Sequence, residues 1–207
     1  MKTLRLDEIE GVPVLGTLMW KPIRRPLGIT AFGINAYTAA GAGDEVVEDH
    51  TEQTNGHEEI YVVVQGHAVF TVDGEEVDAP AGTLVYLDDP SVRRSAVAKE
   101  PGTTVLAIGG VPGKHEPTAW EYFFPALPYG RTGDWARAEE LVREGIGEYG
   151  EHPVLLYQLA CYEARQGKSE DALEHLNAAA AQDERAREWA QTDDDLASIR
   201  DDPRFPR

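Results

Sequence analysis

The chain of 207 residues contains a single cysteine, Cys161, so it cannot form a disulfide bond within itself. It also lacks an apolar run long enough to cross a bilayer. Its first residues, MKTLRLDEIEG, do not contain the apolar stretch of a secretory signal peptide. Because chains without disulfides are typical of a reducing compartment, these absences predict a cytoplasmic protein.

Basic residues are scarce in both halves of the chain. Lys and Arg together number 19 against 37 Asp and Glu, which gives a net charge of −18 with histidine neutral. An acidic surface repels phosphate backbones and anionic lipids. The composition therefore predicts that the protein binds neither nucleic acid nor membranes.

Helical periodicity is missing from residues 1 to about 125, which consist of short apolar runs separated by glycine, proline and acidic turns. The dipeptide Asp73-Gly74 stands between two such runs and is typical of a two-residue hairpin, because both turn positions need positive φ. Short strands without intervening helices indicate an antiparallel barrel or sandwich. The clearest predicted strands are 30–37, 60–64, 68–72, 83–87, 92–98 and 103–108.

The hydrophobic period changes after Gly130, where alanine becomes common and apolar residues recur at helical spacing. Small residues repeat at an interval of 34 residues, which suits places where two packed helices approach closely. The pairs in this repeat are Ala126 and Ala160, Ala138 and Ala172, and Gly145 and Ala179. Residues 156–176 resemble a tetratricopeptide repeat, and the resemblance extends over residues 131–183.

Two domains of an α+β protein are therefore predicted. Residues 1–125 should form an antiparallel β-barrel, and residues 126–207 should form tetratricopeptide-like helical hairpins with a C-terminal cap. The cap would use Leu196, Ile199 and Phe205 to cover the apolar end of the helices. Because fewer than three such repeats rarely bury a core alone, we expect the helical half to contact the β domain or a protein partner.

The segment 43–66 is the richest in residues that can carry chemistry. Gly43 is followed by histidines and glutamates, then by a short apolar strand that ends at Gly66. This order resembles the first cupin motif, and the spacing from Glu59 to Gly66 is that of the family. The resemblance covers residues 28–110. It implies a jelly-roll β-barrel in which two histidines, a glutamate and a later histidine hold one divalent metal.

Two alignments with that motif are open. Anchored at Glu59, the family's two histidines fall on Gln53 and Asn55. Anchored at Gly43, they fall on His50 and Glu52, so that His50, Glu52 and Glu59 form a set of one nitrogen and two oxygen ligands. His57 could replace one of the carboxylates. Imidazole with carboxylate suits Fe, Mn, Ni or Zn, and His50, His57 and Glu59 are the candidate metal ligands.

The second cupin motif corresponds to residues 81–94, and the family's last histidine falls on Arg94, or on Arg93 if the turn is shorter. Arginine stays protonated and does not ligate metals, so one usual ligand is lost. By strand alternation Glu59 shares a face with Tyr61, and a buried Glu59 needs a partner. We therefore predict a Glu59–Arg94 pair where other cupins hold a metal, with Tyr61 beside it as a third ligand-binding residue.

Three functions remain open on these grounds. The favoured one is a small-molecule-binding or regulatory cupin whose barrel holds an anionic or polar ligand near Arg94, with helical repeats that contact a partner or the barrel. The second is a metal-dependent enzyme, a dioxygenase, isomerase or lyase, that uses His50, His57 and Glu59; no catalytic residue is otherwise identified. The third is an interaction module with a filled barrel. The resemblance also implies a homodimer, to which residues 30–37 would contribute as an unpaired edge.

Overall fold

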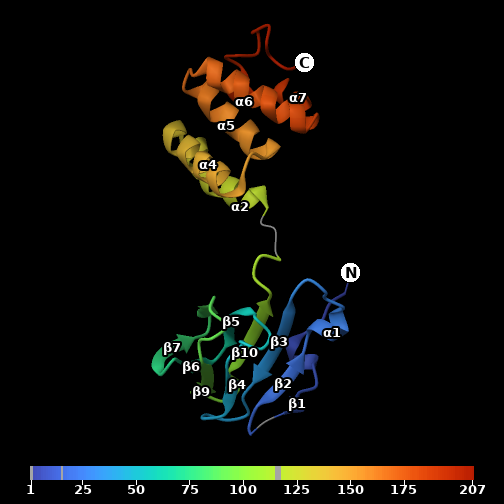
Figure 1. Ribbon diagram of the computed structural model, residues 1–207, viewed down its shortest axis with the longest axis vertical. Helices are drawn as coiled ribbons and strands as arrows, with labels where there is room; N and C mark the ends of the chain where they lie inside the picture. The colour runs from blue at the N-terminus through green and yellow to red at the C-terminus, as the bar shows by residue number, and fades with distance from the viewer. Residues whose placement is uncertain (1, 15, 115–117) are drawn as a thin grey trace. The chain divides into compact units, whose positions relative to one another are not determined.

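The computed structural model describes residues 2–14, 16–114 and 118–207, which separate into two compact units. The first unit is built mainly of strands and the second of helices, so the chain is α+β, as predicted (Figure 1). Among the described residues, no helix combines the length and the apolarity that a bilayer crossing requires.

The described residues of the first unit include ten strands, which form two antiparallel sheets with the order β1-β2-β3-β10-β5-β8 in one and β4-β9-β6-β7 in the other. Two short helices, η1 (Leu6–Glu8) and α1 (Arg24–Leu27), precede β3. The described strands do not close into one barrel, so the expected barrel is replaced by two sheets. The strands are β1 (Val12–Pro13), β2 (Met19–Pro22), β3 (Gly33–Thr38), β4 (Glu45–His50), β5 (Glu58–Gln65), β6 (His67–Val72), β7 (Glu75–Pro80), β8 (Leu84–Leu87), β9 (Arg94–Ala98) and β10 (Thr104–Gly110).

The two sheets share one core. Tyr61 and Val63 of the first sheet and Phe70 of the second belong to the same buried cluster, and the rings of Tyr61 and Phe70 pack at a tilt of 51° with centroids 5.6 Å apart. The hairpin predicted at Asp73-Gly74 joins β6 to β7, and both residues have positive φ, 48° and 88°. Sequence alternation along these strands thus decides which side chains enter the space between the sheets.

The predicted edge strand lies inside a sheet. β3 pairs with β2 on one side and with β10 on the other, so residues 30–37 do not offer an unpaired edge, and that part of the dimer prediction is wrong. Association of two copies stays a prediction.

The second unit begins its helices at Ala119, before the boundary expected at residue 126. A capping box between Thr118 and Glu121 opens α2. The helices are α2 (Ala119–Phe123), η2 (Phe124–Ala126), α3 (Leu127–Thr132), α4 (Trp135–Tyr149), α5 (Pro153–Arg165), α6 (Ser169–Gln182), α7 (Arg185–Ala190) and η3 (Asp194–Leu196). α5 and α6 form a hairpin across Gly167, whose φ of 77° suits glycine.

The small residues of the 34-residue repeat lie where helices meet. The five alanines of the repeat, at positions 126, 138, 160, 172 and 179, are fully buried. A Cβ placed on Gly145 would lie 2.5 Å from the Cβ of Tyr122, so α2 packs directly on the backbone of α4. Leu196, Ile199 and Phe205 are buried in the same cluster as residues of α5 and α6, and that they cap a stack of repeats stays a prediction.

Candidate metal centre

A cavity of about 210 Å³ opens inside the strand unit, and most of its lining is polar. Three glutamates, two histidines and two tyrosines contribute to it, from strands β3, β4 and β5 and from the loop between β4 and β5. The lining residues are Gly33, Asn35, Tyr37, Val47, Glu48, His50, Glu52, His57, Glu59, Tyr61, Ala107 and Gly109. A polar cavity inside an apolar core is a candidate functional site.

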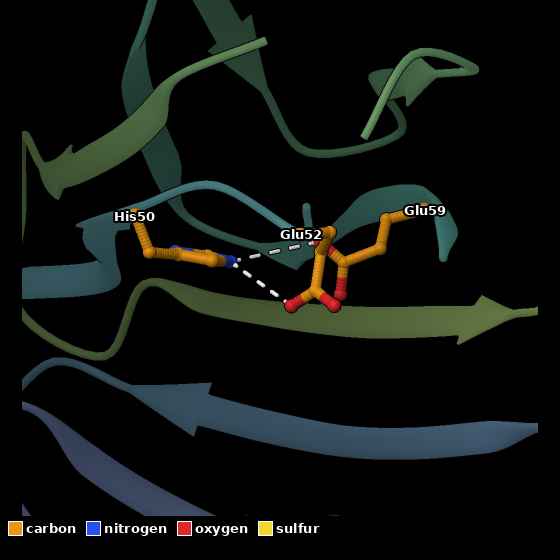
Figure 2. A group of neighbouring side chains, drawn as sticks. All are labelled: His50, Glu52 and Glu59. Atoms are coloured by element: carbon orange, nitrogen blue, oxygen red, sulfur yellow. Dashed lines mark ion pairs between the residues drawn. The ribbon is translucent and has the colours of Figure 1, made fainter. Parts of the chain in front are cut away.

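Three of these side chains converge on one point (Figure 2). His50 ends β4, Glu52 lies in the following loop, and Glu59 lies near the start of β5. The Nε2 atom of His50 is 3.5 Å from Oε1 of Glu52 and 3.7 Å from Oε2 of Glu59. One donor atom from each residue lies within 4.8 Å of the other two.

Each of the three candidate ligand side chains is oriented by a hydrogen bond. The Nδ1–H of His50 donates to the backbone carbonyl of Glu48 at 2.8 Å, which leaves the lone pair on Nε2 facing the carboxylates. The side-chain amide of Asn55 donates to Oε2 of Glu52 at 2.8 Å, so Oε1 stays available. The hydroxyl of Tyr61 donates to Oε2 of Glu59. Metal ligands in proteins are typically held by such outer contacts.

The spacing of the three candidate ligand atoms suits a shared cation. Two ligand atoms that are each about 2.1 Å from one ion stand roughly 3.0–3.4 Å apart in octahedral or tetrahedral geometry. The separations of 3.5 Å and 3.7 Å around Nε2 come close to this range and are long for hydrogen bonds. One imidazole nitrogen and two carboxylate oxygens fit Zn, Mn or Fe and leave coordination positions for water or substrate.

The charges of the site are coupled. The nearby carboxylate of Glu59 raises the pKa of His50 above its usual value, although burial acts in the opposite direction. Burial disfavours the ionised form of Glu59, but the contacts from His50 and Tyr61 outweigh it and hold the pKa of Glu59 below its usual value. Without a metal, Glu59 and Glu48 therefore favour the protonated form of His50.

Both tyrosines of the cavity are neutral hydrogen-bond donors. Burial raises the pKa of Tyr61, and the nearby Glu59 raises it further. Burial likewise raises the pKa of Tyr37, with additional contributions from Glu48 and Glu59. These hydroxyls can therefore donate to a carboxylate or to a bound molecule at any physiological pH.

Arg94 lies beside this group but does not hydrogen-bond to it. It stands directly opposite His50 in the β4–β9 register, and such cross-strand neighbours share a face of the sheet. Its side chain is 0% exposed, and Nε is 4.0 Å from Oε2 of Glu59. Within the described residues, none of its three side-chain nitrogens has a hydrogen-bond partner. The structure thus brings Glu59, Tyr61 and Arg94 together, but Glu59 accepts from Tyr61 and not from Arg94.

His57 lies at the edge of the group. Its Nδ1 atom is 3.6 Å from Oε2 of Glu52, and its side chain is 36% exposed, whereas Glu52 is 9% exposed as a residue. The convergent set is therefore His50, Glu52 and Glu59, the one given by the alignment anchored at Gly43. Of the alternative pair, Asn55 orients Glu52 instead of serving as a fourth ligand.

Sequence reasoning missed Glu48 and Tyr37 as cavity residues. Strand alternation could have found Glu48, because it is two residues before His50 on β4 and shares its face. Tyr37 could be found only with the sheet order, since β3 and β4 belong to different sheets and β10 lies between β3 and β5.

No family model and no curated protein matches the chain. Solved structures of cupins resemble the N-terminal half. KdgF from Halomonas sp. is 20% identical, with 53% of this chain and 92% of that chain covered and a TM-score of 0.44. A sugar phosphate isomerase of the cupin superfamily from Silicibacter pomeroyi is 19% identical, with 52% and 74% covered and a TM-score of 0.43. A cupin protein from Bacteroides fragilis is 23% identical, with 54% and 91% covered and a TM-score of 0.40. At these identities the similarity concerns the fold alone.

Proposed function

We propose that the strand unit binds one divalent transition-metal ion through His50, Glu52 and Glu59 and acts on a small polar molecule in the adjoining cavity. The observation that carries this proposal is the set of outer contacts. Glu48 and Asn55 each hold one ligand side chain so that its other ligand atom faces the same point, and Tyr61 holds the Oε2 atom of Glu59 that lies 3.7 Å from Nε2 of His50. Solvated side chains on an acidic loop would have no reason to be oriented in this way.

The cavity residues support proton-transfer chemistry such as isomerisation or elimination. A bound metal would polarise an oxygen of the substrate and leave the proton movements to the protein. His57 lines the cavity, is partly open to solvent and lies next to Glu52, which suits a group that accepts or releases a proton. The neutral hydroxyl of Tyr37 can donate a hydrogen bond to a developing negative charge.

Arg94 favours a second candidate function, a metal-free binding pocket. Its buried guanidinium has no hydrogen-bond acceptor among the described residues, and buried donors normally have one. In this alternative, Glu59 turns toward Arg94 and the cavity holds an anionic or polar ligand without a metal. In the metal-dependent function, Arg94 instead acts as a fixed positive charge that favours ionised Glu59.

The helical unit supports a separate role in binding protein surfaces. We propose that its hairpins are tetratricopeptide-like, on the basis of the 34-residue repeat of buried small residues and the buried cap. Such a unit would mediate association with a protein partner, with a second copy of the chain, or within the chain.

Metal content decides between the two candidate functions of the strand unit. Protein purified without a histidine tag should contain close to one equivalent of Mn, Fe, Ni or Zn by mass spectrometry. After removal with EDTA, adding the metal back should raise the melting temperature, because a ligand at 100 times its Kd stabilises the folded state by about 2.7 kcal/mol.

Matched variants test whether the metal-induced rise in melting temperature depends on the proposed ligands. Glu52→Gln and His50→Gln keep the size of the side chains but should abolish the metal-induced rise in melting temperature. His67→Gln is the control, since His67 pairs with Asp78 outside the cavity. Absence of both metal and thermal response in the wild type would refute the metal proposal and favour the metal-free pocket.

A further inference from the structure

The helical unit contains a second cavity that the proposed metal chemistry does not use. Its volume is about 600 Å³, within the range of small-ligand sites, and its lining is mostly apolar. Residues from α2, α5 and α7 form it, together with His152, which caps α5, and Asp193, which caps η3. All of these residues belong to the helical unit, so the cavity is complete within residues 118–207.

Aromatic rings form its walls. Tyr157 of α5 and Trp189 of α7 stand at 86° to one another with centroids 5.6 Å apart, so their planes make a corner. Trp120 and Phe123 of α2 add a second pair with centroids 5.7 Å apart. Trp120 is 50% and Trp189 41% exposed, so these rings are accessible to a ligand. The face of an aromatic ring carries negative electrostatic potential and attracts cations.

An acidic group without a cationic partner accompanies the rings. The carboxylate of Asp193 accepts hydrogen bonds from the Tyr157 hydroxyl at 2.9 Å and from the backbone N–H of Asp195 at 3.0 Å. In the part of the chain that the structure describes, no cationic side chain pairs with the carboxylate of Asp193, and the guanidinium of Arg200 donates to the backbone carbonyl of the same residue. The cationic residue of the same cavity, Arg185, is paired with Asp183 at 2.7 Å. The negative charge of Asp193 is therefore left for a ligand.

One cation already stacks in this cavity. The guanidinium carbon of Arg185 lies 5.6 Å from the centroid of the Trp189 ring, inside the range of cation–π attraction. The pocket offers one carboxylate and several rings, which do not suit a strongly hydrated metal ion that needs several oxygen ligands. A weakly hydrated organic cation loses little on entering such a site and gains contact with the ring faces.

We propose that this cavity binds an organic cation, an alkylated ammonium group, with its charge facing Asp193 and its methyl groups against Trp189, Tyr157 and Trp120. The net charge of −18 on the chain would also raise the local concentration of cations around it. The proposal does not depend on the metal site, because every residue that it uses lies in the helical unit.

The experiment compares choline with its neutral isostere 3,3-dimethylbutan-1-ol, which has the same shape and no charge. Each is titrated into the full-length protein by calorimetry, with tryptophan fluorescence as a second signal because two of the four tryptophans line the cavity. We expect choline to bind and the neutral alcohol to bind at least tenfold more weakly. Equal binding would overturn the proposal, since it would show an apolar pocket without cation recognition, and so would no binding of either compound.

Two charge-matched variants make the result specific. Asp193→Asn keeps the shape of the side chain and one oxygen that accepts from the Asp195 N–H, while its NH2 group can donate to the Tyr157 hydroxyl, and should weaken choline binding at least tenfold. Asp194→Asn removes the same charge from the neighbouring exposed residue, which does not line the cavity, and should leave binding within twofold of the wild type. Trp189→Leu, which keeps an apolar side chain without a π face, should also weaken binding. Equal losses in both aspartate variants would assign the effect to overall charge and would overturn the site.

Discussion

Replacement of Arg94 by methionine tests the electrostatics beneath the candidate metal centre. Methionine retains much of the volume of the arginine stem but removes the charge, so Glu59 loses its nearest permanent cation. The two charged groups are 4.0 Å apart. At that distance two unit charges interact by about 4 kcal/mol at the effective dielectric constant of a protein site. Relief of the desolvation of the guanidinium offsets part of this.

We therefore expect Arg94→Met to lower the free energy of unfolding of the strand unit by about 2–3 kcal/mol, measured with EDTA present. In a Glu59→Gln background, where the carboxylate charge is absent and Tyr61 can still donate to the amide oxygen, the same substitution should cost less than about 1 kcal/mol. The difference between the two backgrounds is the coupling energy of the pair.

Hydrogen exchange of the β4, β5 and β9 amides is the appropriate measurement, because it reports on the strand unit separately from the helices. Far-ultraviolet circular dichroism checks that each variant folds. An equal loss of stability in both backgrounds would refute the reasoning, since it would show that Arg94 contributes only volume to the core. A gain in stability in the wild-type background would show that desolvation of the guanidinium exceeds its attraction to Glu59.

Three further predictions concern the same residues and the helix packing. Because the pKa of His50 is raised, its proton stabilises the metal-free fold fully below the unfolded pKa of about 6.5, and this contribution is lost as the pH rises through the folded pKa. The free energy of unfolding in EDTA should therefore fall over that pH interval, while the metal-induced rise in melting temperature should grow. A metal response independent of pH would contradict His50 as a ligand. Tyr61→Phe removes the hydroxyl that orients Glu59 and should weaken metal binding by roughly 10–100-fold in a calorimetric titration, with little loss of stability. Unchanged affinity would show that this hydrogen bond does not contribute to metal binding. Gly145→Ala places a Cβ 2.5 Å from the Cβ of Tyr122 and should destabilise the helical unit by about 1–3 kcal/mol in chemical denaturation. An unchanged free energy of unfolding would mean that α2 does not pack on α4 in this way.

Local patterns in the sequence predicted much of the fold. The two-residue hairpin at Asp73-Gly74 depends only on which residues accept positive φ, so it could be found without tertiary information. The change of hydrophobic period separated the strand half from the helical half, because the spacing of apolar residues along the chain is also a local property. Pro125 and Pro128 occupy first-turn positions of η2 and α3, where proline is tolerated, so neither proline ends the helical region that begins at Ala119.

The candidate site was only partly contained in the local pattern. The alignment anchored at Gly43 named His50, Glu52 and Glu59, but it could not choose between Glu52 and His57. The loop between β4 and β5 decides, because the N–H of Glu52 donates to the Pro90 carbonyl and the Glu52 carbonyl accepts from Asn55, which turns Glu52 inward. The partner at Pro90 is far away in the chain, so no local rule reveals this contact.

Tertiary structure alone also decided the partner of Glu59. The sequence placed Glu59 and Arg94 on inward faces of two strands, and the β4–β9 register indeed sets Arg94 opposite His50. Their separation of 4.0 Å, and the hydrogen bond from Tyr61 that Glu59 takes instead, depend on the bulges in that pairing and on the fit of side chains between the two sheets. Alternation along a strand determines the face on which a residue lies, whereas the distance between residues on different strands is set by register and packing, which only the folded chain specifies.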